Sequence, residues 1–289
     1  MLRQRIITAV LMLAVFLPAL FYASPWPFAG LSLVLLTAAA WEWGRLNALS
    51  APAAWAMGLA CLLAGVLAWW AGCLQLDLVW AWSLAALVWV LGGGWLLARG
   101  VPAWPAVPRW LRCLLGLLLL WTAWLAVAQA RMLGINFLLS VLTLVWMADV
   151  AAYFAGRAWG GRWIARKLAA QISPGKSWEG AIGGAVGVLI LGLAWSAVES
   201  RMLLPVPERS LHGQLLAQHG LGVMLLALVF LSAMSVVGDL LESLLKRSAG
   251  VKDSSGLLPG HGGVLDRVDA LLPVLPLAMM LAAFSRFSA

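Results

Sequence analysis

Residues 243–269 read SLLKRSAGVKDSSGLLPGHGGVLDRVD, and this charged stretch separates two apolar runs of the chain, at about 221–241 and 268–284. It contains four of the 19 Lys and Arg residues and three of the 11 acids, although charged residues make up only 10% of the sequence. Polar groups beside a membrane-like sequence are costly to bury and tend to mark function. We therefore expect this stretch to lie at a membrane surface and to carry chemistry.

The composition of the whole chain is that of a polytopic membrane protein. Of its 289 residues, 64% are hydrophobic and 19 are tryptophans, whereas roughly 25% of the residues of an ordinary soluble domain are charged. A net charge of +8 would suit a nucleic-acid partner. However, the basic residues lie between apolar runs, as membrane-surface charges do. The three cysteines have no CxxC or Cys-His spacing, so they are not expected to bind a metal.

Nine apolar runs are candidates for membrane-spanning helices, each of which needs about 20 residues. They cover approximately residues 6–23, 28–41, 53–73, 76–98, 114–130, 135–154, 181–198, 221–241 and 268–284. The first run resembles a secretory signal, but it is long for one and further spans follow at once, so we expect an uncleaved helix. The sequence predicts an all-α polytopic fold with an N-terminal region of five helices (1–132) and a C-terminal catalytic region of four (133–289).

The distribution of positive charge predicts the orientation of these spans. If the chain crosses at each run, one side receives Arg3, Arg5, Arg45, Arg99, Arg109, Arg112, Arg157, Arg162, Arg166, Lys167, Lys176, Lys246, Arg247, Lys252 and Arg267. The other side receives only Arg131, Arg201, Arg209 and Arg286. The richer side belongs in the cytoplasm, so we expect the N-terminus inside and the C-terminus outside. The loops 156–180 and 246–267 then share the cytoplasmic side, while the loop 199–220 is external.

Five acids are expected to converge from three segments, namely Asp149, Asp239, Glu242, Asp266 and Asp269. Spacings of three and four place Asp239, Glu242 and Lys246 on one face of a helix. One interpretation is a set of interfacial ion pairs that reach water. The other is a cation site, because so many converging acids repel one another. Clustered carboxylates without His or Cys suit a hard ion such as Mg²⁺.

Two turn-rich segments accompany these acids. Gly175-Lys176-Ser177 resembles the end of a P-loop, but Ala170 stands where that motif needs its first glycine. What remains is a helix start that can hold a phosphate, or a plain helix cap formed by Ser173 or Ser177. In the second segment, glycines around His261 permit close approach of the backbone to a ligand. His261 is either a ligand contact or a turn residue.

The stretch 243–269 resembles the defining pattern of the phosphatidate cytidylyltransferases (CDP-diacylglycerol synthases), S-x-x-K-R-x4-K-D followed by P-G-H-G-G-x-x-D-R-x-D. The resemblance is strongest over residues 145–269. Its further matches are 238–242, Ser173-Pro-Gly-Lys176 with Trp178, Asp149 with Tyr153 and Gly156, and Trp41-Glu42-Trp43.

The resemblance implies that CTP and phosphatidic acid give CDP-diacylglycerol and pyrophosphate. It also implies a homodimer in the bacterial inner membrane, an active site on the cytoplasmic side, and Mg²⁺ with room for a second, monovalent cation such as K⁺. By position, it assigns catalytic roles to Asp239, Asp266, Asp253, Asp269, Lys252, Arg267 and His261. It assigns substrate binding to Lys246, Arg247, Ser173, Lys176, Asp149 and Ser243. Asp239 and Asp266 are the first candidates for metal ligands.

Three other functions compete with this hypothesis. Intramembrane acids also mark the pathways of ion-coupled transporters, although those acids lie near mid-span rather than at one surface. A cytidylyltransferase for another lipid phosphate would share the same pattern. A structural membrane scaffold would leave the acid cluster without a purpose.

Overall fold

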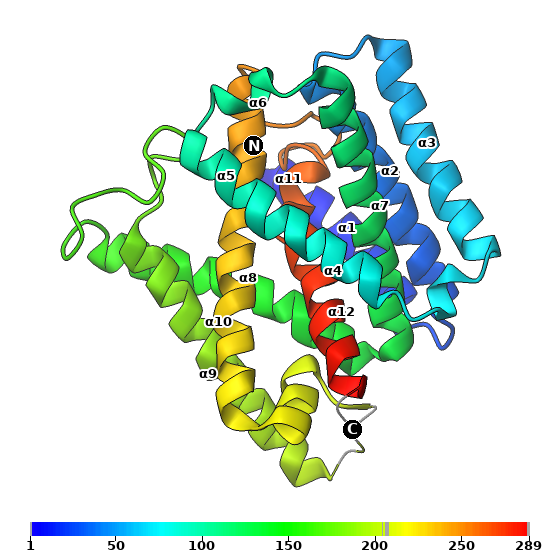
Figure 1. The fold of residues 1–289 in the computed structure, drawn as a ribbon, viewed down its shortest axis with the longest axis vertical. Helices are drawn as coiled ribbons and strands as arrows, with labels where there is room; N and C mark the ends of the chain where they lie inside the picture. The colour runs from blue at the N-terminus through cyan, green and yellow to red at the C-terminus, as the bar shows by residue number, and fades with distance from the viewer. Residues whose placement is uncertain (1, 204, 206–207, 288–289) are drawn as a thin grey trace.

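The computed structural model describes residues 2–203, 205 and 208–287, and every long element among them is a helix (Figure 1). In chain order these are α1 (Leu2–Phe21), α2 (Trp26–Leu46), α3 (Ala51–Trp70), η1 (Cys73–Gln75), α4 (Val79–Leu87), the π-helical η2 (Val88–Gly92), α5 (Gly93–Arg99), α6 (Ala103–Ala106), α7 (Arg109–Leu133), α8 (Ile135–Trp159), α9 (Trp178–Met202), α10 (Leu211–Ser248), α11 (Leu265–Val268) and α12 (Leu271–Phe287). The predicted all-α fold is confirmed.

Eight helical segments of the described chain are long and apolar enough to cross a membrane. They correspond to eight of the nine predicted spans, with α4, η2 and α5 together forming one of them. The remaining predicted span, at about residues 28–41, corresponds to α2. This helix is 21 residues long, but its last turns contain Glu42, Trp43 and Arg45, and it is not among the eight. The chain is therefore a multi-pass membrane protein.

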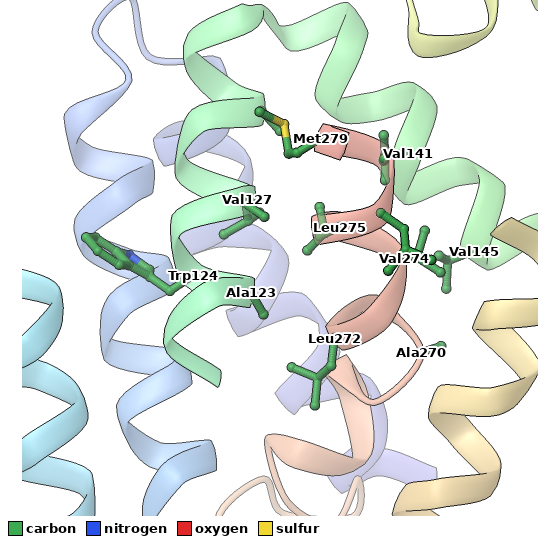
Figure 2. Close-up of a cluster of buried hydrophobic side chains, with 14 of the residues drawn as sticks. Ala123, Trp124, Val127, Val141, Val145, Ala270, Leu272, Val274, Leu275 and Met279 are labelled. Atoms are coloured by element: carbon green, nitrogen blue, oxygen red, sulfur yellow. The ribbon is translucent and has the colours of Figure 1, made fainter. Parts of the chain in front are cut away.

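The last long helix, α12, lies at the centre of the bundle and packs against α4, α7, α8 and α10. Figure 2 shows Val274 and Leu275 of α12 among side chains of α7 and α8, including Val127 and Val145. Val274 is fully buried. Because α12 follows directly on the charged stretch, this packing fixes the position of that stretch in the bundle.

The helices α8 and α9 approach each other through small residues. α8 and α9 form the most extensive helix pair in the molecule. A Cβ added at Gly184 of α9 would lie 2.8 Å from the carbonyl oxygen of Ala148 in α8. Close approach of this kind is typical of membrane helices, in which small residues let backbones come together.

Several predicted boundaries were wrong. The expected external loop 199–220 is largely helical, because α9 continues to Met202 and α10 begins at Leu211, where the Ser210 side chain accepts a hydrogen bond from the Gly213 N–H. Gly220, with a φ of 81°, produces the kink that the apolar pattern had suggested as a helix start. At the other end, α10 continues to Ser248, so Lys246 and Arg247 are helical rather than part of the predicted loop 246–267.

Candidate active site

The loop between α8 and α9 and the loop between α10 and α11 meet at one end of the bundle. Each contains a Pro-Gly turn and an isolated β-bridge, Ala169 to Ser173 just before the turn in the first loop and Leu258 to Gly262 around the turn in the second. The guanidinium of Arg247, at the end of α10, donates to the Ile172 carbonyl in the first loop at 3.5 Å. The two loops therefore share one side of the molecule, as the charge pattern predicted.

Lys246 joins two acids from different segments. Its ammonium contacts Glu242, one turn earlier on α10, and lies 2.7 Å from Oδ1 of Asp266 in α11. The side chains of the three groups are 14%, 4% and 6% exposed respectively. The face predicted from the spacing of Glu242 and Lys246 is real, and Asp266 is brought to it. Lys246 therefore pairs with carboxylates, and its expected contact with a substrate phosphate stays a prediction.

A second group of charges surrounds Asp239. Lys176, from the α8–α9 loop, forms an ion pair with it, and Ser243 donates to its Oδ1 across 3.4 Å. Asp149 of α8 and Asp269, which follows α11, both lie within electrostatic range of Asp239. The predicted convergence of acids from three segments is therefore confirmed in space.

Backbone groups hold Asp266 in place. Its Oδ2 accepts hydrogen bonds from the N–H groups of Ser254 (3.0 Å) and Gly263 (2.7 Å) and lies 2.9 Å from the Ser254 hydroxyl. Gly262, which has a φ of 84°, permits this approach. A residue with a Cβ at this position would collide with the Asp266 carboxylate. The carboxylate thus has one oxygen on the loop and the other on Lys246.

A cavity of about 520 Å³ opens beside Asp239. Its wall is formed by α8, the start of α9 and part of α10, and it contains the polar side chains of Asp149, Tyr153, Arg157, Lys176 and Asp239. The Arg157 guanidinium donates to the Tyr153 hydroxyl at 3.1 Å. The rest of the wall is mostly apolar, with Ala148, Ala152 and Val236 among its residues. Such a cavity can take a molecule with an anionic head and a hydrocarbon body.

Among the basic residues predicted to contact substrate, Arg247, Lys252 and Arg267 are exposed. Arg267 is oriented by the His261 carbonyl, which accepts from its Nε at 3.0 Å and its Nη2 at 2.6 Å. The imidazole Nδ1 of His261 is buried and has no hydrogen-bond partner among the described residues. The three exposed basic side chains are accessible to an anionic substrate. The roles assigned to them and to His261 stay predictions.

The remaining predicted residues lie on the loops themselves. Asp253 is exposed and lines a smaller cavity of about 310 Å³ together with Arg45. Ser173 closes the turn that precedes Lys176 through its backbone. Ser177 is the N-cap of α9, since its hydroxyl accepts from the Gly180 N–H at 3.1 Å. The helix-cap interpretation is therefore confirmed for Ser177 and not for Ser173.

The carboxylate oxygens of the cluster are the type of ligand that a hard cation prefers, although they do not form a complete coordination site. All the acids of the cluster offer carboxylate oxygens, which Mg²⁺ prefers, and Mg²⁺ usually binds through one or two carboxylates together with substrate phosphates. Within residues 2–203, 205 and 208–287, no group of three His, Cys, Asp or Glu side chains is arranged to hold a metal ion. Asp239 and Asp266 instead face Lys176 and Lys246.

Sequence reasoning gave no role to Glu42, which is fully buried and contacts the loop that carries Asp266. Two signals pointed to it: a carboxylate between two tryptophans near the end of an apolar run, and the match of Trp41-Glu42-Trp43 to the resemblance. Sequence reasoning also gave no role to Glu179. It is 2% exposed at the start of α9 and accepts from the N–H groups of Trp163 and Ile164.

Comparison with known proteins extends this description. Residues 3–285 match the model of the cytidylyltransferase family. A phosphatidate cytidylyltransferase of Pseudomonas aeruginosa is 39% identical over 284 residues, which cover 96% of this chain and 95% of the relative. One from Haemophilus influenzae is 34% identical over 304 residues, with 96% of each chain covered. One from Bacillus subtilis is 40% identical over 153 residues, or 53% of this chain and 49% of the relative.

Proposed function

The chain belongs to the cytidylyltransferase family, and from this premise we propose that it transfers the cytidylyl group of CTP to phosphatidic acid. The products are CDP-diacylglycerol and pyrophosphate, so the protein is a nucleotidyltransferase of phospholipid biosynthesis. The observation that carries this proposal is the meeting of Asp149, Asp239, Glu242, Asp266 and Asp269 with two lysines beside a largely apolar cavity. A polar centre of this kind lets the acyl chains of a lipid stay in the membrane while its phosphate meets a nucleotide.

The reaction joins two anions. A phosphate oxygen of the lipid attacks the α-phosphorus of CTP, and pyrophosphate leaves in line with the new bond. Because the attacking phosphate is already ionised, the site needs no strong general base. Catalysis then comes from positioning and from neutralisation of charge. Lys176 and Arg157 line the cavity, while Arg247, Lys252 and Arg267 are exposed cations of α10, the following loop and α11.

The cofactor we propose is Mg²⁺, held by Asp239 and Asp266, with Asp253 and Asp269 as further candidates. When bound, it would supply positive charge to the phosphate oxygens that gain charge during transfer. The residues support this, because Asp239 lies within range of the like charges of Asp149 and Asp269, which raise the cost of ionising all three. A monovalent second cation and a homodimeric assembly are further parts of the proposal, and both rest on the resemblance.

We also propose the finer topology, with nine spans that include α2, the N-terminus inside and the C-terminus outside. The membrane is the inner membrane of a bacterium, and the site faces the cytoplasm, where CTP is found. Fifteen basic residues against four support this orientation. Chemical labelling of single cysteines placed at Gly256 and Asp77, with a reagent that cannot cross membranes, tests it. Labelling of the Gly256 position in intact cells, and not of the Asp77 position, would reverse the orientation.

The activity is tested by incubating the purified protein with CTP labelled at the α-phosphate, Mg²⁺ and a panel of lipid phosphates. We expect label to enter the lipid with phosphatidic acid and unlabelled pyrophosphate to be released. Transfer to a polyprenyl or ether-linked phosphate alone would assign the protein to another substrate of the same family. Absence of label in every lipid would remove the proposed activity and leave the transporter hypothesis.

A further inference from the structure

Glu42 is a fully buried carboxylate on α2, remote in sequence from the residues assigned to the reaction. Burial of an ionised carboxylate is unfavourable unless hydrogen bonds or a cation compensate it. The hydrogen bonds of Glu42 in the described structure come from residues 254–265, the loop that precedes and begins α11. Its burial is therefore explained by that loop.

Four donors converge on this one carboxylate. Oε1 accepts from the Ser255 hydroxyl at 2.5 Å and from the Val264 N–H at 3.0 Å. Oε2 accepts from the Leu265 N–H at 2.6 Å and lies 3.2 Å from the Ser254 hydroxyl. Charge-assisted bonds of these lengths are stronger than bonds between neutral groups. Glu42 thus fixes both ends of the loop, at 254–255 and at 264–265.

The same loop holds Asp266. The Ser254 hydroxyl lies between the two carboxylates, 3.2 Å from Glu42 and 2.9 Å from Asp266, while the Ser254 N–H donates to Asp266. Because a hydroxyl has one proton, Ser254 is a donor that Glu42 shares with Asp266, and the Asp266 contact is the shorter. Movement of Ser254 away from Glu42 would therefore change the orientation of Asp266.

The loop packs tightly around the carboxylate of Glu42. A Cβ added at Gly263 would lie 2.0 Å from the Ser254 hydroxyl and 2.3 Å from Oε1 of Glu42. On the outer side of the loop, the Thr8 hydroxyl of α1 donates to the Pro259 carbonyl at 2.9 Å. The first two helices, which carry no candidate chemistry, thus hold the catalytic loop against the bundle.

We propose that Glu42 is a positioning residue, which orients Asp266 by fixing the loop 254–265 and does not itself touch substrate. This inference deepens the proposed function and rests on it. It assigns a task in the reaction to the N-terminal half of the chain. It also distinguishes Glu42 from a residue that serves the stability of the fold alone.

The test is Glu42→Gln, which keeps the shape of the side chain. A glutamine has one acceptor oxygen, so it cannot accept from the N–H groups of both Val264 and Leu265, and its own amide group would face one of them. We expect faster hydrogen–deuterium exchange of residues 254–265 and a kcat for CDP-diacylglycerol formation lowered roughly tenfold or more. The KM for CTP should stay within about twofold, because Glu42 does not touch substrate.

Glu199→Gln is the matched control. Glu199 is also buried, at 3% exposure, and it also accepts from the start of a helix, through the Ser210 N–H at 2.7 Å and hydroxyl at 2.9 Å. It lies near the far end of α9, away from the site. We expect Glu199→Gln to lower thermal stability about as much as Glu42→Gln does and to leave kcat unchanged.

A milder variant covers the case in which Glu42→Gln does not fold. Ser255→Ala removes one of the four donors, and it should raise exchange and lower kcat in the same direction by a smaller factor. Unchanged exchange in residues 254–265, or an equal fall of kcat in Glu199→Gln, would overturn the proposal. If the wild-type protein forms no CDP-diacylglycerol, the proposed function fails, while the exchange comparison still decides whether Glu42 holds the loop.

Discussion

The ammonium of Lys246 lies 2.7 Å from the carboxylate of Asp266, although the two residues belong to different helices and are 20 positions apart. The same ammonium contacts Glu242. One ammonium therefore bridges carboxylates of two segments, α10 and α11. The contact therefore joins two tasks, since it holds α11 against α10 and presets the charge of the site.

Lys246→Met is expected to destabilise the protein and abolish transfer. Removal of one partner from a buried ion pair leaves uncompensated charge and typically costs about 3–5 kcal/mol. Thermal unfolding in detergent and product formation from labelled CTP measure the two effects. The double variant Glu242→Gln with Lys246→Met should regain most of the stability and none of the activity. A single variant as stable as the wild type would show that the pair is not structurally important.

Much of this cluster could be predicted from the sequence, because helical spacing alone places Glu242 and Lys246 on one face. The approach of Asp266 to that face followed from the motif resemblance and from the side shared by the two loops. The partner of Lys176 could not be predicted. Whether Lys176 contacts a carboxylate or a phosphate depends on loop geometry, which a count of charges does not contain.

The helix ends were less predictable than the helices. Hydropathy marks where a chain is apolar, but α10 extends at both ends through polar residues, from Leu211 to Ser248. Its start depends on the cap formed by Ser210 and its bend on the positive φ of Gly220. The role of Glu42 could not be predicted, although the resemblance included it, because its partners come from more than 200 positions away.

Lys176→Met is expected to lower two kinetic quantities, the rate of transfer and the Mg²⁺ concentration for half-maximal activity. Lys176 and Asp239 are 25% and 33% exposed, so their ion pair contributes at most about 1 kcal/mol to stability. Transfer should fall because a cation is lost from the cavity. The Mg²⁺ concentration for half-maximal activity should also fall, because the ammonium and the metal compete for one carboxylate.

Lys167→Met is the control for this change, since Lys167 is an exposed lysine in the same loop. It should alter neither the rate nor the Mg²⁺ requirement by more than about twofold. A higher Mg²⁺ requirement in Lys176→Met would contradict the competition and would indicate that Lys176 helps to hold the substrate together with the metal.

Gly238→Ala tests the fit between α10 and the segment that carries Asp269. A Cβ at Gly238 would lie 2.5 Å from the carbonyl oxygen of Asp269 and 2.9 Å from the Pro273 ring. Overpacking of this kind costs about 1–3 kcal/mol, and it would also move Asp269 relative to Asp239. We expect lower thermal stability and lower activity. Gly222→Ala on the same helix meets no atom within 4 Å, so it should be neutral or slightly stabilising. Equal behaviour of the two variants would mean that the α10 contact is loose.

Asp266→Asn is expected to abolish transfer while the protein still enters the membrane. The carboxylate accepts from two N–H groups on one oxygen and faces an ammonium on the other. An asparagine amide group would therefore oppose donors in either orientation, at a cost of about 1–3 kcal/mol, and a metal ligand would be weakened. The amount of protein in the membrane fraction and the yield of CDP-diacylglycerol separate folding from chemistry. Asp77→Asn, an exposed acid outside the site, should leave both unchanged. Near-normal transfer by Asp266→Asn under saturating Mg²⁺ would remove Asp266 from the reaction, because a neutral amide cannot supply the charge that the proposed metal site requires.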